Sequence, residues 1–124
     1  MDLPLNVAVI GCGMLARQQH IPNIIHSERM QLHTCCDLDE AALTACRQTA
    51  PGVHTSTDFH ETVADAAIDL VVLTTTEAVR LPVIGACSRV GKPMYVEKPL
   101  AGTLEELSQI EAVVGASGIR VCVG

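Results

Sequence analysis

The residues with the clearest chemical potential in this 124-residue chain lie in a short glycine segment near its start. Gly11 and Gly13 directly follow an apolar run and form a G-x-G-x-x-A pattern with Ala16. Gly11 suits a tight turn, Gly13 lets backbone amides approach a phosphate, and a helix N-terminus behind them offers free N–H groups. We therefore predict a dinucleotide-binding turn, rather than a purely structural turn or one for another nucleotide-like ligand. The predicted turn comprises Gly11, Cys12, Gly13, Met14, Leu15 and Ala16.

An aspartate at the end of the second expected strand is the next candidate. The Asp37 carboxylate can accept hydrogen bonds from both adenosine ribose hydroxyls and would repel a 2′-phosphate. The following residue, Leu38, supplies no compensating cation. Asp37 therefore favours NAD, with NADP as the second choice. The competing interpretation is that Asp37 and Asp39 form only a solvated turn and helix cap, and Asp39 is assigned to capping in either case.

A polar segment follows the fourth expected strand. In a doubly wound sheet, ligands bind over the carboxyl ends of the strands, near the point where the strand order reverses. We therefore predict that this segment faces the cofactor and lines the region of the nicotinamide ribose, with the residues Thr74, Thr75, Thr76 and Glu77. The alternative is that the threonines only end a strand and that Glu77 starts a helix.

Lys98 follows the fifth expected strand, so it should lie at the same edge of the sheet. An ammonium group there can bind a substrate hydroxyl, stabilise an alkoxide or relay a proton. Glu97 could orient this lysine, and the peptide bond before Pro99 could be cis. On residue type alone, a solvated Glu97–Lys98 pair is the simpler interpretation.

Strand and helix patterns alternate along the chain and would bring these residues together. A parallel sheet of about six strands with right-handed crossovers follows from this alternation, with helices on both faces. We predict one α/β domain over residues 1–124, a doubly wound sheet of the Rossmann type. Leu15, Ile21, Ile24 and Ile25 are expected to face the sheet from the first helix. The expected strands are 5–10, 31–37, 53–55, 69–75, 93–96 and 119–123, and the expected helices are 14–26, 40–48, one beginning near 58–61, 79–90 and 103–116.

Composition and charge limit the classes of function that fit this chain. Hydrophobic residues make up 48% of the chain but aromatic residues only 2%, which suits the aliphatic core of a covered parallel sheet. A formal net charge of −6 and the lack of any Lys/Arg run argue against nucleic-acid and membrane surfaces. The start of the chain lacks a basic leader segment, so a cytoplasmic protein is expected.

The six cysteines show no metal or disulfide spacing, because no C-x-x-C is present. Cys35 and Cys36 are adjacent on an expected strand, so their side chains should point to opposite faces. We expect small buried thiols in a reducing compartment and no bound metal. The five histidines also lack metal-ligand spacing.

Several segments, taken together, resemble the glucose–fructose oxidoreductase, inositol dehydrogenase and rhizopine-catabolism (Gfo/Idh/MocA) family over essentially the whole chain. The resemblance implies an NAD(P)-dependent oxidoreductase for sugars, cyclitols and related alcohols, with a Rossmann domain followed by an α+β domain built on an open antiparallel sheet. It also implies that Lys98 is the catalytic or substrate-binding lysine, and that Gly11, Gly13, Asp37, Thr75 and Glu97 line the cofactor site. The segments are Val7–Gly13, Cys36-Asp37, Gly91-Lys92-Pro93 and Val96–Ala101.

Two departures from the family pattern affect these expectations. Thr76 and Glu77 replace a proline segment that many members carry, and Arg80 replaces a histidine. The chain also stops after the expected sixth strand, so we expect the second domain, with its aspartate and histidine, to be missing. The chain should then bind cofactor with little or no turnover, meet its polyol-like substrate through that second domain, and self-associate through the uncovered face.

Two other functions use a similar glycine turn. A non-catalytic NAD(H)-sensing regulatory module would bind the cofactor without chemistry, and Lys98 argues against it because a sensor needs no proton relay. An S-adenosylmethionine-dependent methyltransferase also has an acidic residue after its second strand. Such an enzyme has no need of Glu97-Lys98-Pro99.

Overall fold

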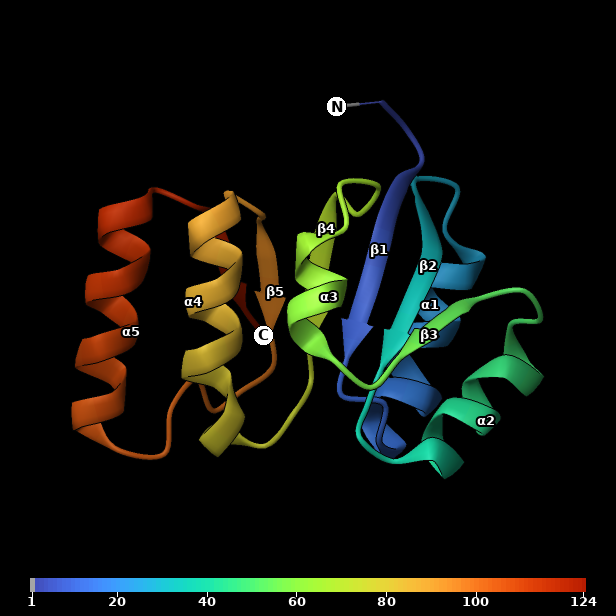
Figure 1. Cartoon of the computed structure of the whole chain (residues 1–124), viewed down its shortest axis with the longest axis horizontal. Helices are drawn as coiled ribbons and strands as arrows, with labels where there is room; N and C mark the ends of the chain where they lie inside the picture. Colours follow the sequence, from blue (N-terminus) through green and yellow to red (C-terminus); the bar gives the residue numbers. More distant parts are fainter. Residues whose placement is uncertain (1) are drawn as a thin grey trace.

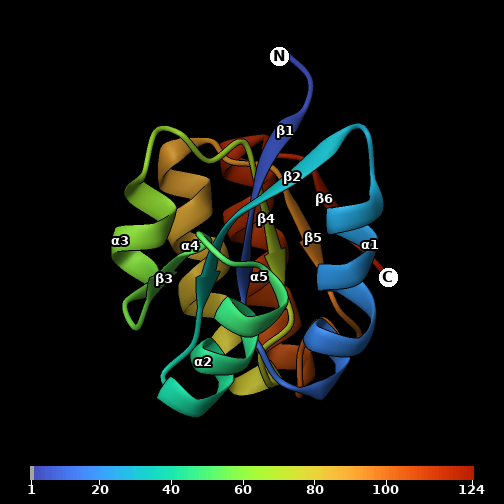
Figure 2. The same ribbon diagram turned by 90° about the vertical axis from the view of Figure 1, so that its right-hand side faces the viewer.

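The computed structural model describes residues 2–124, which form a six-stranded sheet with helices on both faces (Figures 1 and 2). All neighbouring strands are parallel, and their order is β3-β2-β1-β4-β5-β6. This order confirms the predicted doubly wound Rossmann fold, and the strand order reverses between β1 and β4. The strands are β1 (Leu5–Ile10), β2 (Met30–Cys36), β3 (His54–Ser56), β4 (Leu70–Leu73), β5 (Met94–Val96) and β6 (Val121–Val123).

Three helices begin and two helices end at caps that the sequence provides. Side chains of Asp39, Asp58 and Thr103 accept backbone N–H bonds of 3.0, 2.9 and 3.1 Å from the first turns of α2, α3 and α5. Gly91 and Gly118 end α4 and α5 with left-handed φ angles of 75° and 70°. The elements are η1 (a π-helix, Ala16–His20), α1 (Ile21–His26), α2 (Glu40–Thr49), α3 (Phe59–Ala64), η2 (a 3-10 turn, Glu77–Val79), α4 (Arg80–Val90) and α5 (Leu104–Ser117).

Two aliphatic cores lie on opposite sides of the sheet. Val7 and Val9 of β1 pack with α1 and α2, whereas Ala8 and Ile10 pack with α3, α4 and α5. Figure 2 shows α1 on one side of the strands and α3 and α4 on the other. Cys35 and Cys36 belong to different cores, as their alternation on β2 predicts.

One prediction about the sheet-facing side of the first helix was wrong. Ile21 and Ile24 are buried, but Leu15 and Ile25 are 40% and 41% exposed and do not form its sheet-facing side. Ile25 lies about 100° around α1 from Ile24, and Leu15 precedes the π-helical turn η1, so neither shares the buried face of Ile21 and Ile24. Helical conformation nevertheless runs without a break from Met14 to His26.

The other differences between prediction and structure concern the residues at which strands begin and end. β4 ends at Leu73, so Thr74 and Thr75 lie in the following loop rather than in the strand. β6 is an edge strand that begins at Val121, two residues later than predicted, and it leaves Cys122 exposed, unlike the other five cysteines. Within residues 2–124, the helices are too short or too polar to cross a membrane.

Candidate functional site

The glycine turn after β1 is held tightly against the loop after β4. Gly11 has a φ of 91°, and a Cβ placed on it would lie 2.6 Å from the backbone nitrogen of Thr75. Glycine is therefore required at position 11 both by conformation and by space. Gly13 differs, because a Cβ there would meet no atom of residues 2–124 within 4 Å. The open side of Gly13 is where a ligand can approach the backbone.

The Asp37 carboxylate joins the end of β2 to this turn. Its Oδ2 accepts a 2.7 Å hydrogen bond from the backbone N–H of Cys12, and its Oδ1 accepts one of 2.9 Å from that of Asp39. Each carboxylate oxygen has a second lone pair, so both can still accept a hydroxyl donor. Asp37 thus supports the turn and remains able to bind a ribose.

A pocket of about 400 Å³ opens at the carboxyl ends of β1, β2 and β4. Its position is the reversal of strand order, where doubly wound sheets bind ligands, and its size is typical of a small-molecule site. Six predicted residues line it, namely Gly11, Gly13, Asp37, Thr74, Thr75 and Thr76. The remaining lining residues were not assigned to the site from the sequence, and they are Ile10, Cys36, Leu38, Thr57, Phe59 and Val79.

The other predicted turn residues do not line this pocket. The Cys12 side chain is buried beneath the turn, and Ala16 is buried against the sheet, where its small size allows close packing. Met14 is 68% exposed and Leu15 is 40% exposed. These four residues shape the turn and the start of the helix, while the two glycines form the pocket wall.

The threonines have a structural contact as well as a place in the pocket. The Thr74 hydroxyl donates to the carbonyl oxygen of Gly11, which ties the end of β4 to the glycine turn. The Thr75 hydroxyl donates to the carbonyl oxygen of Thr76 at 3.1 Å. The threonines thus follow the strand and also face the pocket.

The Glu97-Lys98-Pro99 turn lies at the end of β5, outside the pocket. Lys98 is exposed, the Lys98–Pro99 peptide bond is cis, and the Lys98 N–H donates to the carbonyl oxygen of Gly124 at 3.0 Å. Glu97 contacts His20 rather than Lys98, with 2.9 Å between its Oε2 and the histidine Nε2. The His20 ring also lies 5.5 Å from that of Tyr95. No role for His20 was predicted from the sequence, because the histidines lack metal-ligand spacing.

Comparison with known proteins agrees with this geometry. The profile of the Gfo/Idh/MocA family, described as an oxidoreductase family with an NAD-binding Rossmann fold, matches residues 5–124. The chain belongs to this family.

Individual family members show the same relationship. Inositol 2-dehydrogenase 2 from Saccharopolyspora erythraea is 31% identical over 124 residues, covering 98% of this chain and 36% of that protein. The WlbA dehydrogenase from Chromobacterium violaceum, solved with NADH and UDP-GlcNAcA, superposes with a TM-score of 0.89 at 27% identity, covering 99% of this chain and 35% of that one. GenD2 from gentamicin A biosynthesis, solved with NAD, gives 0.87 at 27% identity, covering 100% and 35%. The chain thus spans about a third of the length of the curated relatives it matches.

Arg80, which the sequence resemblance places where many family members have a histidine, is buried at the start of α4. Only 3% of it is exposed, and one nitrogen, Nη2, donates to the carbonyl oxygen of Thr75 at 2.9 Å. Its Nε and Nη1 are buried and have no hydrogen-bond partner within residues 2–124. Burial lowers the pKa of Arg80, while nearby Glu77 and Glu97 act in the opposite direction. Arg80 therefore holds the loop that lines the pocket, at the expense of two unsatisfied donors.

A second cation lies beside the glycine turn. The exposed Arg17 side chain reaches back along the helix, and its Nε donates to the carbonyl oxygen of Cys12 at 3.0 Å. Its charge adds to the partial positive charge at the start of the helical segment that begins at Met14. The sequence analysis did not single out Arg17, because an exposed arginine in a helix is usually only solvated.

Proposed function

We propose that this domain presents a nicotinamide dinucleotide for hydride exchange with a sugar, cyclitol or related alcohol or ketone. The observation that supports this proposal most directly is the pocket at the strand-order reversal, where Gly11, Gly13 and Asp37 meet. Lys98 lies outside this pocket, in the turn that follows β5. Family membership supports the cofactor class. The bound nicotinamide would accept or supply the hydride, and the residues of this chain would bind, orient and move a proton.

The pocket suits the adenosine half of the dinucleotide. Leu38, Phe59 and Val79 give it apolar walls that can hold an adenine ring and exclude water. Asp37 would accept the ribose hydroxyls, and the backbone at Gly13 would approach the pyrophosphate. No side chain at Gly13 obstructs that approach.

Lys98 is our candidate for the acid–base step. It is exposed at the carboxyl end of β5, at the same edge of the sheet as the glycine turn. Its ammonium group would donate a hydrogen bond to the reacting oxygen and stabilise the alkoxide that forms during oxidation. The contact between His20 and Glu97 would restrain the backbone next to this lysine. Glu77 and Glu97, which lie outside the pocket, are proposed for the nicotinamide side.

We infer a preference for NAD over NADP from the residues at the end of β2. The Asp37 carboxylate would repel a 2′-phosphate, and the adjacent Leu38 is 88% exposed and uncharged. NADP remains the second cofactor in our proposal. Leu38 is the residue that we expect to decide between NAD and NADP, because a cation in its place would offset the repulsion between Asp37 and the 2′-phosphate.

The 124 residues by themselves are expected to bind cofactor with little or no turnover. Relatives such as inositol 2-dehydrogenase 2 are nearly three times as long, and Lys98 is the one acid–base group that we assign from this chain. Self-association is the other part of this proposal. Its support is the edge strand β6, where Val123 is 46% exposed.

Calorimetric titration with NAD(H), NADP(H) and S-adenosylmethionine, side by side, tests the cofactor proposal. We expect NAD(H) to bind and Gly13→Ala to weaken it at least tenfold, because the added Cβ occupies the pyrophosphate approach. Gly115→Ala is the matched control, since its Cβ also meets nothing within 4 Å and it lies in α5. Binding of S-adenosylmethionine in preference to NAD(H), or equal affinities of the two variants, would overturn the proposal.

A further inference from the structure

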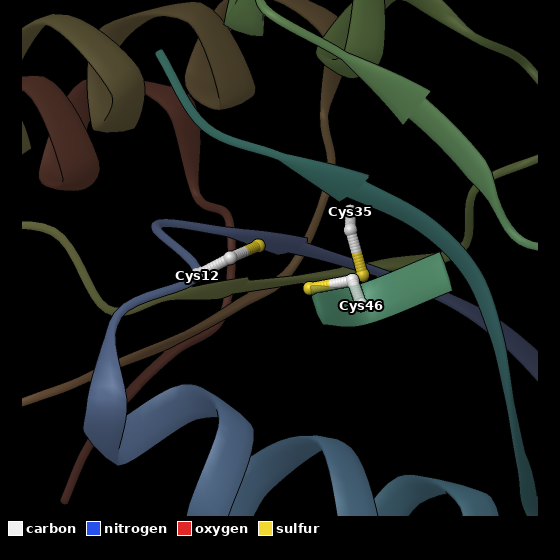
Figure 3. A group of neighbouring side chains, drawn as sticks. All are labelled: Cys12, Cys35 and Cys46. Carbon is white, nitrogen blue, oxygen red and sulfur yellow. The ribbon is translucent and has the colours of Figure 1, made fainter. Parts of the chain in front are cut away.

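Three cysteine side chains converge directly beneath the glycine turn. Cys12 comes from the turn, Cys35 from β2 and Cys46 from α2, and their sulfur atoms all lie within 4.8 Å of one another. Figure 3 shows the three side chains pointing toward a common centre. Each is 0% exposed and none forms a disulfide. The sequence spacing of 23 and 11 residues between them gave no indication of this cluster.

The donor set of the cluster is made of sulfur alone. Among His, Cys, Asp and Glu side chains of residues 2–124, the group close enough to share one ion consists of these three. Their surroundings are aliphatic, with Val7, Val9 and Leu43 in the same core. Thiolate ligands select soft ions such as Cu(I), whereas Mg²⁺ and Ca²⁺ require oxygen ligands.

The number and spacing of the sulfurs favour a three-coordinate ion. Structural zinc takes four protein ligands, and a zinc site with three keeps a water in the fourth position. Three fully buried cysteines offer neither a fourth protein ligand nor access for a water. With metal–sulfur bonds of about 2.3 Å, a trigonal site has sulfur–sulfur spacings of about 4 Å. The thiols therefore need to approach one another by less than about 1 Å.

The surroundings of Cys12 and Cys46 determine the protonation of these two thiols before an ion binds. Burial raises the pKa of the Cys46 thiol to about 11, and hydrogen bonding with Cys35, together with burial, raises the pKa of Cys12 far above its ordinary value. The Cys12 and Cys46 thiols are thus neutral near pH 7, and binding an ion must displace their protons. Arg17 lies on the rim of the cluster, where its charge favours the Cys46 thiolate.

We propose that Cys12, Cys35 and Cys46 form a buried three-sulfur site for Cu(I) beneath the glycine turn. Each Cu–S bond to a thiolate replaces an S–H bond, whose proton leaves to solvent. No electron is transferred, so copper stays Cu(I) and the sulfurs stay reduced. Arg17 offsets part of the negative charge that remains. The site depends on the chain's own thiols and is independent of the proposed hydride transfer.

Anaerobic titration of the reduced chain with Cu(I), in competition with a colorimetric Cu(I) chelator, tests the site. Cys122→Ser serves as the background, because Cys122 is exposed and would bind copper adventitiously. In that background we expect one Cu(I) per chain, with a first shell of three sulfurs by X-ray absorption. Cys35→Ala and Cys46→Ala should each lower the affinity at least 100-fold.

Cys87→Ala is the matched control, because Cys87 is also buried and free but packs in the opposite core. It should leave the Cu(I) affinity within twofold. Circular dichroism of each variant establishes that it is folded before titration. No stoichiometric binding, a two-sulfur shell, or equal losses in Cys87→Ala and Cys46→Ala would overturn the assignment. Loss of NAD(H) binding would have no bearing on it, so the two proposals fail separately.

Discussion

A Cβ on Gly11 would lie 2.6 Å from the backbone nitrogen of Thr75, so the turn after β1 and the loop after β4 are in backbone contact. The Thr74 hydroxyl adds a hydrogen bond to the carbonyl oxygen of Gly11 across the same junction. One wall of the pocket is therefore built from two segments more than sixty residues apart in sequence. Substitutions at the two glycines of the turn should consequently have different effects.

Gly11→Ala should destabilise the fold, whereas Gly13→Ala should not. Alanine at position 11 must adopt a φ of 91° and displace the Thr75 backbone, which should lower the free energy of unfolding by about 2 kcal/mol or more. Alanine at position 13 meets open space and should change it by less than about 0.5 kcal/mol. Urea unfolding measures both values. Equal stability of the two variants would contradict the predicted contact at Gly11.

Leu38→Arg should move cofactor preference toward NADP. Leu38 is 88% exposed beside the Asp37 carboxylate and lines the pocket, so an arginine there can pair with a 2′-phosphate. We expect NADPH to bind about tenfold more tightly, a change of about 1.4 kcal/mol. Fluorescence titration with NADPH and NADH measures the ratio. Leu104→Arg, at a site 83% exposed and outside the pocket, should leave the ratio unchanged.

Arg80→Met should stabilise this chain. The guanidinium is buried with two unsatisfied nitrogens, and its one hydrogen bond, to Thr75, does not offset their desolvation. Methionine keeps the unbranched chain without those donors, so the free energy of unfolding should rise by about 1 kcal/mol. Arg80→Ala provides the contrast, because it removes the packing as well and should be destabilising. A loss of stability in Arg80→Met equal to that in Arg80→Ala would contradict the prediction.

Alkaline pH should destabilise the protein through its buried thiols. Burial raises the pKa of Cys36 to about 11 and that of Cys87 to about 12, from an ordinary value of 9.0. The stabilisation is complete below pH 9, and it falls as pH rises from there toward the folded-state values, because the unfolded chain loses these protons first. Each thiol contributes up to about 1.4 kcal/mol per pH unit.

Urea unfolding between pH 8 and pH 10.5 gives the slope of stability against pH. Cys87→Ala should lower stability at pH 8 but flatten the alkaline decline, because one titrating thiol is gone. Cys122→Ala should leave the decline unchanged, since Cys122 is exposed. An identical slope in all three proteins would show that other groups cause the decline.

The sequence by itself determined the topology and the general position of the pocket. Apolar runs end at Gly11, near Asp37 and before Thr74, and strand–helix alternation allows few arrangements of a parallel sheet. Once the sheet is parallel, residues that follow different strands must meet at one edge. That rule alone predicts that Gly11, Gly13, Asp37, Thr74 and Thr75 gather at one site, and all five line the pocket.

Only the tertiary structure decided which side chains contact one another. The His20–Glu97 contact, the burial of Arg80 and the convergence of Cys12, Cys35 and Cys46 join segments with no common spacing in the sequence. The phase of the first helix was also undetermined, because the π-helical turn in η1 rotates every later side chain. The hydrophobic periodicity of the sequence predicts which helices and strands form. Side-chain contacts depend on the register and rotation with which those elements pack.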